Sequence, residues 1–325
     1  MSIDEARANI DLLRLRMKYD VMGRDDVIDL ILVALLADGH VLLEDFPGSG
    51  KTTLAKAMGN SIRKDGVREG MNAFRRMQFT PDLLPGDITG VMVFDPDSNQ
   101  FHFRRGPIFA HIVLVDEINR TSPKVQSALL ESMGEKQVTV DDVTHPLKDL
   151  FFVIATQNPL DAVGTYPLPI AQLDRFLFKI RMTAVSREAE LEVIKSWGRP
   201  RQACDFEQIS VDQILDARKI VRNDIAVSDE IMDCLVDIIR TIRDDSRCLQ
   251  GASTRSIVQA VPALQAHAFL HHRDYVSAED IKDLAIPLFS HRLQLAPGGG
   301  DADTLVTEAS QEPLKKLSLG SLKSR

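Results

Sequence analysis

A glycine-rich run, Pro47-Gly48-Ser49-Gly50-Lys51-Thr52-Thr53, contains the residue types that bind phosphate. Its glycines let consecutive backbone N–H groups point inward around phosphate oxygens, and the helix expected next adds its positive N-terminal end. Lys51 would reach the β and γ phosphates, and the hydroxyl of Thr52 would ligate Mg²⁺. The general pattern has Gly where this chain has Asp45, so the match is incomplete. We predict a nucleoside triphosphate site, for ATP with Mg²⁺.

Two carboxylates, Asp116 and Glu117, follow the apolar run Val113-Leu-Val. In a phosphoryl-transfer site the first would be a metal ligand, holding Mg²⁺ with its water shell. The second would orient and deprotonate the attacking water. A strand that ends in Asp-Glu is also a common surface feature. The position about sixty residues after the glycine-rich run favours the catalytic interpretation.

Asn158 follows the apolar run Ile154-Ala-Thr, at the end of a predicted strand. Sheets of α/β proteins place their ligands at the carboxyl ends of the strands, where an amide can hydrogen-bond a γ-phosphate or a water. The alternative is an ordinary Asn-Pro turn. Because this run follows the glycine-rich loop and the two carboxylates in chain order, we favour a role as a phosphate sensor.

Two arginines are further candidates for contact with phosphate. Arg175, in a Gln-Leu-Asp-Arg-Phe run, would act as an arginine finger across a subunit interface. A plain surface salt bridge with Asp174 is the alternative, and both remain open. Arg255 stands in the first turn of a predicted helix that Ser253 or Thr254 would cap, where the helix dipole disfavours a cation. A nearby phosphate would explain that placement; the alternative is an ordinary exposed arginine.

Short apolar runs separated by helical patterns must position these groups. Runs that are apolar on both faces predict a parallel sheet flanked by helices. Two segments with alternating apolar residues around a polar centre, 91–103 and 137–147, predict hairpins. The strands are expected at 40–44, 76–79, 111–116 and 150–156, and the helices at 5–18, 25–38 and 52–58.

The pattern changes after about residue 186, where helical periodicity dominates. Further helices are expected at 187–197, 211–222, 228–243, 254–272 and 278–289. We predict an α/β nucleotide-binding core with two hairpin inserts over 1–186, followed by an all-α lid domain over 187–296. Polar residues from Pro297 onward predict a mobile C-terminal tail over 297–325, with a short helix near its end.

The bulk composition is that of an ordinary globular protein, with 44% hydrophobic and 26% charged residues. The net charge of −8 and the pI of about 5.5 argue against a surface that grips nucleic acid. The three cysteines, Cys204, Cys234 and Cys248, show no C-x-x-C spacing, which predicts reduced thiols. The first twenty residues lack the core of a signal peptide, and the longest apolar stretch is far too short to span a bilayer. We expect a cytoplasmic protein with no membrane insertion.

Longer runs around these elements narrow the interpretation. They are Gln78-Phe-Thr-Pro-Asp-Leu-Leu-Pro-Gly-Asp-Ile-Thr-Gly90, Gly106-Pro-Ile-Phe-Ala110, Asp116-Glu-Ile-Asn-Arg120, Gln126-Ser-Ala-Leu-Leu-Glu131, Gly164-Thr-Tyr-Pro-Leu-Pro169 and Ala171-Gln-Leu-Asp-Arg-Phe176. Together with the five elements above, in this order, they resemble the MoxR family of AAA+ ATPases, within the helix-2-insert clade. The resemblance covers residues 5–295 and is most specific over 40–180. Ile170 departs from it, because the family often has Glu there.

The resemblance implies a P-loop AAA+ core and a helical lid with the nucleotide between them. It also implies a ring-shaped homo-oligomer, commonly a hexamer, in which Arg175 acts on a neighbour's ATP. By resemblance alone, Val21 and Gly23 border the adenine. The implied function is a chaperone ATPase that remodels or activates a client protein, with von Willebrand factor A-domain proteins and metal-cofactor enzymes as the expected clients.

Two other functions compete with this interpretation. Helicases share these inserts, so a nucleic-acid motor is the main alternative. Such motors place Lys or Arg at the hairpin tips, whereas these tips centre on Asp95-Pro-Asp97 and Asp141-Asp142 and would repel a phosphate backbone. A nucleotide switch that does not hydrolyse ATP is disfavoured by the presence of Glu117 and Arg175.

Overall fold

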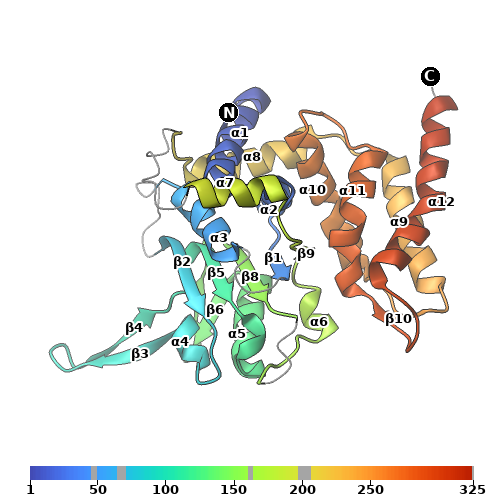
Figure 1. Ribbon diagram of the computed structural model, residues 1–325. Helices are drawn as coiled ribbons and strands as arrows, with labels where there is room; N and C mark the ends of the chain where they lie inside the picture. Colours follow the sequence, from blue (N-terminus) through green and yellow to red (C-terminus); the bar gives the residue numbers. More distant parts are fainter. Residues whose placement is uncertain (45–49, 64–70, 160–163, 197–205, 324–325) are drawn as a thin grey trace.

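The computed structural model describes residues 1–44, 50–63, 71–159, 164–196 and 206–323. At its centre lies a five-stranded parallel sheet in the order β2-β5-β8-β1-β9 (Figure 1). The strands expected from the sequence are present, and the short edge strand β9 is an addition to them. The sheet consists of β1 (Val41–Glu44), β2 (Asn72–Gln78), β5 (Ala110–Asp116), β8 (Phe152–Gln157) and β9 (Phe178–Arg181).

Alternate residues of the central strands enter two hydrophobic clusters, one on each face of the sheet. In β5, Ile112 and Leu114 belong to the first cluster, whereas Val113 and Val115 belong to the second. A parallel sheet covered on both faces is what the apolar runs predict. The first cluster includes residues of α1 (Ile3–Asp20), α2 (Asp25–Leu36) and α3 (Lys51–Asn60), and the second those of α4 (Pro85–Thr89) and α5 (Pro123–Glu135).

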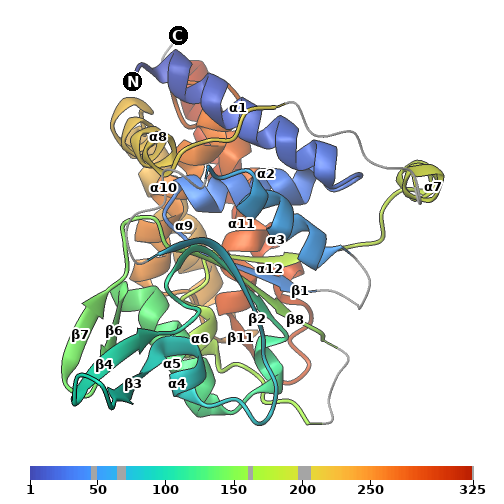
Figure 2. The same ribbon diagram turned by 90° about the vertical axis from the view of Figure 1, so that its left-hand side faces the viewer.

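Two antiparallel hairpins lie side by side near α4 and α5, at the predicted positions (Figure 2). The second hairpin turns over Asp141 and Asp142, whose φ angles are 46° and 63°, as a tight two-residue hairpin turn requires. Phe103 of the first stacks on His145 of the second, with ring centroids 3.9 Å apart, which joins the two hairpins. They consist of β3 (Gly90–Asp95) with β4 (Gln100–Arg105), and of β6 (Gln137–Val140) with β7 (Val143–Pro146).

The C-terminal half is mainly helical, and most of its helices share the first hydrophobic cluster with α1 and α2. Helix α8 packs against α1, and helix α10 packs against α2. The lid and the core therefore share a continuous apolar interior on the face of the sheet that α1 and α2 cover. Ser210 and Ser253 cap two of these helices by accepting hydrogen bonds from first-turn N–H groups. The elements are α6 (Ile170–Leu173), α7 (Arg187–Ser196), α8 (Val211–Asp224), α9 (Asp229–Asp244), β10 (Cys248–Gln250), α10 (Thr254–Leu270), α11 (Ala278–Phe289), η3 (Ser290–Arg292) and β11 (Gln294–Leu295).

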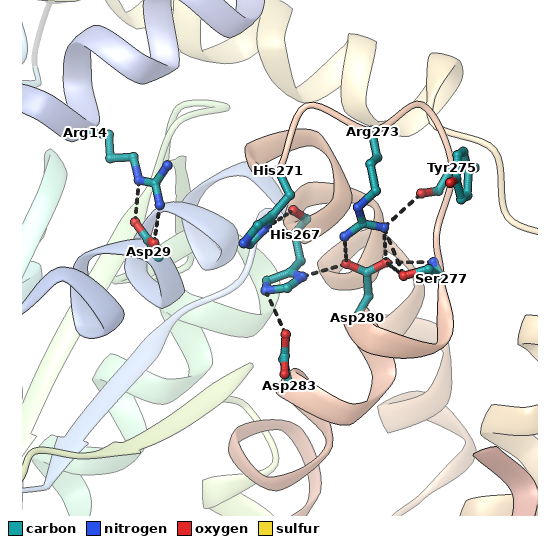
Figure 3. A network of polar contacts seen from close by, with 9 residues as sticks. All are labelled: Arg14, Asp29, His267, His271, Arg273, Tyr275, Ser277, Asp280 and Asp283. Atoms are coloured by element: carbon teal, nitrogen blue, oxygen red, sulfur yellow. Dashed lines mark hydrogen bonds and ion pairs between the residues drawn. The ribbon is translucent and has the colours of Figure 1, made fainter. Parts of the chain in front are cut away.

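The turn between α10 and α11 is built around the fully buried carboxylate of Asp280 (Figure 3). Arg273 donates to it through Nη1 at 2.7 Å, and His267 Nδ1 lies 2.6 Å from it. Ser277 donates to it from its backbone N–H at 2.7 Å and from its hydroxyl at 3.0 Å. Burial alone would raise the pKa of Asp280, but these hydrogen bonds and the charge of Arg273 outweigh it and hold the pKa well below its usual range. The carboxylate is therefore ionised at neutral pH.

Residues 302–323 form a helix, α12 (Ala302–Lys323), where the composition predicts a mobile tail. Leu305, Val306 and Ala309 are buried, and the helix packs against α9 and α11. The prediction is wrong here because the polar surroundings and the preceding glycines mask an apolar stripe at helical spacing. Although α12 has 22 residues, no helix in the described parts of the chain is long and apolar enough to cross a membrane.

Candidate nucleotide site

The candidate residues of the core gather at the carboxyl ends of the sheet strands, because all strands of a parallel sheet end on the same side. Asp116 ends β5, Asn158 follows β8, and α3 follows β1 after the glycine-rich run. The predicted phosphate-binding residues Pro47, Gly48 and Ser49 lie outside the residues that the structure describes, as does Asp45. Their roles remain predictions.

The first turn of α3 places positive charge at this edge. Gly50 caps the helix with a φ of 92°, a left-handed conformation that favours glycine. Lys51, Thr52 and Thr53 follow it, and this turn contains no acidic residue. The helix dipole and the Lys51 ammonium therefore both favour an anion here, as a phosphate group would be.

Asp116 is a nearly buried carboxylate at the end of β5. Its Oδ2 accepts a hydrogen bond from Arg76 Nε of the neighbouring strand β2 at 2.6 Å. Its Oδ1 lies 3.5 Å from Thr156 Oγ1 of β8, which is a long contact. Carboxylate and hydroxyl oxygens are the hard ligands that Mg²⁺ takes, so the donor set of Asp116 and Thr52 fits this metal.

Glu117 leaves the strand in a left-handed backbone conformation, with φ 59° and ψ 53°. This conformation is uncommon outside glycine and is concentrated at functional sites. Its N–H donates to Thr156 Oγ1 at 3.0 Å. Its Oε2 accepts a hydrogen bond from Gln78 Nε2 at 2.9 Å and lies 3.2 Å from Arg120 Nε. The Glu117 side chain is held in one place beside Asp116, yet it is 32% exposed, so water has access to it.

Asn158 lies just beyond β8, as predicted, and is nearly buried. Its carbonyl oxygen accepts a hydrogen bond from Asn119 Nδ2 at 3.4 Å, and Asn119 belongs to η2 (Ile118–Arg120), directly after Glu117. Two residues earlier, Thr156 contacts both Asp116 and the N–H of Glu117. The end of β8 is therefore bound directly to the segment that carries the two carboxylates.

A charged cluster at the end of β1 is not assigned a role from the sequence. Glu44 Oε1 lies 2.9 Å from Lys179 Nζ and accepts a hydrogen bond from Gln157 Nε2 at 2.7 Å. Burial alone would raise the pKa of Glu44, but the contacts with Lys179, Gln157 and Arg181 outweigh it and lower the pKa. The three neighbouring strands β8, β1 and β9 are thereby joined where the chain leaves for the glycine-rich run.

The side chain of Arg175 lies against α5. Its Nη1 donates to the carbonyl of Leu130 at 2.7 Å. Gly134 provides the space, because a Cβ at this position would lie 2.4 Å from the same nitrogen. Its neighbour Asp174 forms an ion pair with Arg292 of η3 at 3.3 Å. These contacts differ from the Asp174–Arg175 surface pair that the sequence leaves open.

Arg255 is exposed in the first turn of α10, and Ser253 is the N-cap, as the sequence predicts. Burial lowers the pKa of Arg292 to about 10, partly opposed by Asp174, and the charge of Arg255 contributes to the lowering. Arg255 therefore lies near Arg292 and the segment that carries Arg175. Within one chain, the described contacts of these arginines are separate from those of Asp116 and Glu117.

Val21 and Gly23 lie in the connection between α1 and α2. Val21 is buried in the first hydrophobic cluster. Gly23 has a φ of 68°, and a Cβ there would lie 2.5 Å from Cβ of Ala189 in α7. This connection therefore packs against the first lid helix. Contact with adenine remains a prediction for both residues.

Arg76 and Gln78 hold the two carboxylates, although the sequence gives them no assigned role. They stand two residues apart on β2, so both side chains leave the same face of the strand. Gln78 also pairs in register with Asp116. Long polar side chains at this spacing, at the carboxyl end of a strand, are the signal that would identify them.

Comparison with known proteins identifies the family. Residues 40–178 match the model for the ATPase family associated with various cellular activities, and residues 241–313 match the AAA lid domain. The chain is 36% identical to Chaperone MoxR1 of Mycobacterium tuberculosis over 310 residues, which covers 91% of this chain and 77% of that one. The chain belongs to the MoxR family of AAA+ ATPases. An AAA+ core with a helical lid, as predicted, is therefore confirmed.

Other relatives agree with this membership of the MoxR family. Uncharacterized protein YeaC of Bacillus subtilis is 46% identical over 293 residues, with 89% of each chain covered. Protein MoxR of Methylorubrum extorquens is 26% identical over 301 residues, with 85% of each chain covered. A crystal structure of a protein from Cytophaga hutchinsonii matches with a TM-score of 0.83 at 34% identity, covering 97% of this chain and 96% of that one.

Proposed function

We propose that this MoxR-family chain hydrolyses ATP at the carboxyl edge of its sheet and uses the turnover to remodel or activate a client protein. The observation that carries this proposal is the placement of Glu117. Its carboxylate follows Asp116 directly, is fixed by Gln78 and remains open to water. A general base in phosphoryl transfer needs this combination of fixed position and access to water.

Each residue of the site has a separate task in this proposal. Lys51, Thr53 and the backbone of the glycine-rich run bind the phosphates of ATP. Thr52 and Asp116 would hold Mg²⁺, which when bound neutralises charge on the phosphates. Glu117 removes a proton from the attacking water, and Asn158 orients that water or the γ-phosphate.

We further propose a closed ring of identical subunits, with six as the expected number, in which Arg175 completes the neighbour's site. Within one chain the guanidinium of Arg175 lies against α5, whereas Glu117 contacts Gln78 and Arg120. An arginine finger supplied across an interface would have such a separate location in its own subunit. Arg255 would supply a second arginine from the lid.

The hairpins provide a surface suited to a client protein. Phe94 and Phe101 face one another on β3 and β4, with ring centroids 5.2 Å apart, and are 46% and 65% exposed. Exposed aromatic side chains are suited to contact with protein. The exposed acidic residues Asp97, Asp141 and Asp142 at the hairpin tips disfavour nucleic acid. The expected client class is a protein with a von Willebrand factor A domain or a metal-cofactor enzyme.

The first experiment tests the phosphate-binding loop. Lys51→Ala removes the side chain expected to reach the β and γ phosphates, so binding of ATP in the presence of Mg²⁺ is expected to weaken at least tenfold, since a charge-assisted hydrogen bond is worth about 1.5 kcal/mol or more. Equilibrium binding of a fluorescent ATP analogue measures the effect. Lys56→Ala, on the exposed side of the same helix, is the matched control and should bind normally. Equal affinity of the Lys51 variant and the control would contradict the proposed site.

The second experiment tests the shared site and the client. Arg175→Ala should retain ATP but lose turnover, and mixing it with Glu117→Gln subunits should restore part of the activity. Restoration is expected because some interfaces then combine an intact Glu117 with an intact Arg175. A failure of mixing to restore activity would argue against a finger that acts across the interface. A pull-down with Glu117→Gln in ATP would recover the client class.

A further inference from the structure

The segment Asp174-Arg175-Phe176 belongs to the core, but residues of the lid hold it on both sides of Arg175. Asp174 Oδ1 accepts a hydrogen bond from Ser256 Oγ of α10 at 3.1 Å and forms the ion pair with Arg292 Nε. The carbonyl oxygen of Phe176 accepts a hydrogen bond from Arg292 Nη2 at 2.8 Å and lies 3.1 Å from His291 Nε2. Both neighbours of Arg175 in the chain are therefore anchored to the lid.

These anchors are buried and fixed in charge. The Arg292 side chain is 1% exposed, and its pKa of about 10 keeps it protonated at neutral pH. Burial, with the charge of Arg292, lowers the pKa of His291 to about 3, so its ring is neutral at neutral pH. Another lid residue, Gln259 of α10, accepts a hydrogen bond from Arg292 at 3.0 Å.

Helix α10, which supplies the anchor Ser256, also carries the second candidate for phosphate contact. Arg255 stands directly before Ser256 in the first turn of α10. One continuous path therefore runs from Arg255 to Ser256, from Ser256 to Asp174, and from Asp174 to its neighbour Arg175. A displacement of α10 would act on the backbone of Arg175 through the hydrogen bond from Ser256 to Asp174, because closely packed interiors transmit such displacements.

We propose that Asp174 is a positioning residue that couples the lid to Arg175, so that the nucleotide state sensed by α10 sets the position of the finger offered to the neighbouring subunit. This inference rests on the proposed function, since it needs Arg175 to act as the finger. In this coupling, the hydrogen bond from Arg175 to the carbonyl of Leu130 on α5 belongs to one of two positions of the Arg175 side chain. Movement of the lid would release the side chain from this position.

The test uses the full chain and two variants that weaken the link in different ways. Ser256→Ala removes the hydroxyl that donates to Asp174 and keeps the Asp174–Arg292 ion pair, so folding is expected to be intact. Asp174→Asn combined with Arg292→Gln replaces the buried ion pair by two amides and leaves no unpaired buried charge. The control is Asp303→Asn, which weakens another contact between lid and core by removing the charge of the group that accepts the 2.7 Å hydrogen bond from Arg181 of β9.

For the two link variants we expect ATP affinity within about twofold of the native chain and a kcat lowered about tenfold or more, because a misplaced catalytic group costs up to about a hundredfold. Mixing either variant with Glu117→Gln subunits should restore activity as it does for Arg175→Ala, whereas a general loss of structure would not be rescued. Asp303→Asn should behave as the native chain. If Arg175→Ala loses turnover while both link variants keep a native kcat, the coupling is refuted and the proposed function stands. If Arg175→Ala itself keeps full turnover, the finger assignment fails and the coupling fails with it.

Discussion

Two carboxylates in this chain, Asp280 in the lid and Asp116 at the sheet edge, each have an arginine partner, but their surroundings differ. Asp280 is fully buried and accepts hydrogen bonds from Arg273 and Ser277 besides its contact with His267. Asp116 has one short hydrogen bond, from an Arg76 side chain that is 45% exposed. Among the residues that the structure describes, the second oxygen of Asp116 has only a long contact, with the hydroxyl of Thr156.

The difference teaches how to separate a structural charge from a functional one. A carboxylate whose oxygens are all satisfied by fixed donors stabilises the fold and has no capacity for another ligand. A carboxylate at a sheet edge with one exchangeable partner can accept a metal ion or a water molecule. Both contain an Asp–Arg pair, so the pair alone does not distinguish them.

The largest effect on ATP hydrolysis is expected for Glu117, at the carboxyl end of β5. Glu117→Gln should lower kcat for ATP hydrolysis about a thousandfold, since loss of a general base costs about 10²–10⁴ in rate. ATP affinity and the midpoint of chemical unfolding should change little, because the amide keeps the size of the side chain. Steady-state hydrolysis and nucleotide binding measure both. Glu131→Gln, exposed on α5, is the control; turnover equal to the control would remove Glu117 from the mechanism.

In the lid, we expect a substitution to lower the stability of the fold. Asp280→Asn leaves the Arg273 charge without its buried partner, so the free energy of unfolding should fall by about 3 kcal/mol or more. Chemical denaturation followed by circular dichroism measures this change. Asp283→Asn is the control, because Asp283 is largely exposed and lies 3.9 Å from His267. A stability loss no greater than that of the control would show that the network is not structural.

Acid should weaken this same contribution. Because the pKa of Asp280 is lowered on folding, its stabilisation is complete above the unfolded-state pKa of about 3.9 and is lost as the pH falls further toward the folded-state pKa. The difference in unfolding free energy between the native chain and Asp280→Asn should therefore be constant from about pH 7 to pH 5 and shrink below about pH 4. A difference that grows on acidification would reverse the assigned direction of the shift.

A smaller effect is expected for the residue that fixes Glu117. Gln78→Leu keeps a similar size but removes the 2.9 Å hydrogen bond, so kcat should fall about tenfold, because a hydrogen bond to a charged group is worth about 1.5 kcal/mol or more. ATP binding should be retained. Steady-state kinetics separate kcat from KM. A change in KM alone would assign Gln78 to nucleotide binding instead.

The smallest effect is expected for the exchangeable partner of Asp116. Arg76→Gln removes a cation that competes with Mg²⁺ for the carboxylate, so half-maximal hydrolysis should need about two- to fivefold less Mg²⁺, in line with about 0.5–1 kcal/mol for an ion pair whose arginine is exposed to solvent. Titration of activity with Mg²⁺ measures it. Arg75→Gln, the exposed neighbour on the same strand, controls for the loss of charge alone. A requirement for more Mg²⁺ would mean that Arg76 supports the metal site.

Much of the fold is predictable because hydrophobic periodicity reports burial directly. The apolar run of β5 predicts a buried strand, and the helical spacing of apolar residues from α8 to α11 predicts helices. The predicted bounds are close to those in the structure. Strand β9 has four residues, two of them charged, and is identified as a strand by its pairing with β1. The helix at 302–323 is missed because its apolar stripe gains meaning only through contact with α9 and α11.

Candidate site residues can be proposed from the sequence where one residue type has one chemical use. A lysine after glycines, or paired carboxylates after a strand, can be interpreted without knowledge of partners. Arg76 and Gln78 are missed because their roles depend on which strand lies beside β2. The lid anchors at Ser256 and Arg292 are missed for a similar reason, since they contact residues that are distant in the sequence.

The helix α12 sets a limit on how this chain can be shortened or fused. Its residues Leu305 and Val306 cover apolar surface of the lid, and Asp303 connects it to Arg181 of β9, which also contacts Glu44 at the end of β1. Trimming the chain at its glycine run near residue 300 would remove α12 from the lid. The apolar surface of α9 and α11 that α12 covers would then be exposed to solvent and prone to aggregation. The C-terminal segment, polar by composition, is thus an integral part of the packed structure.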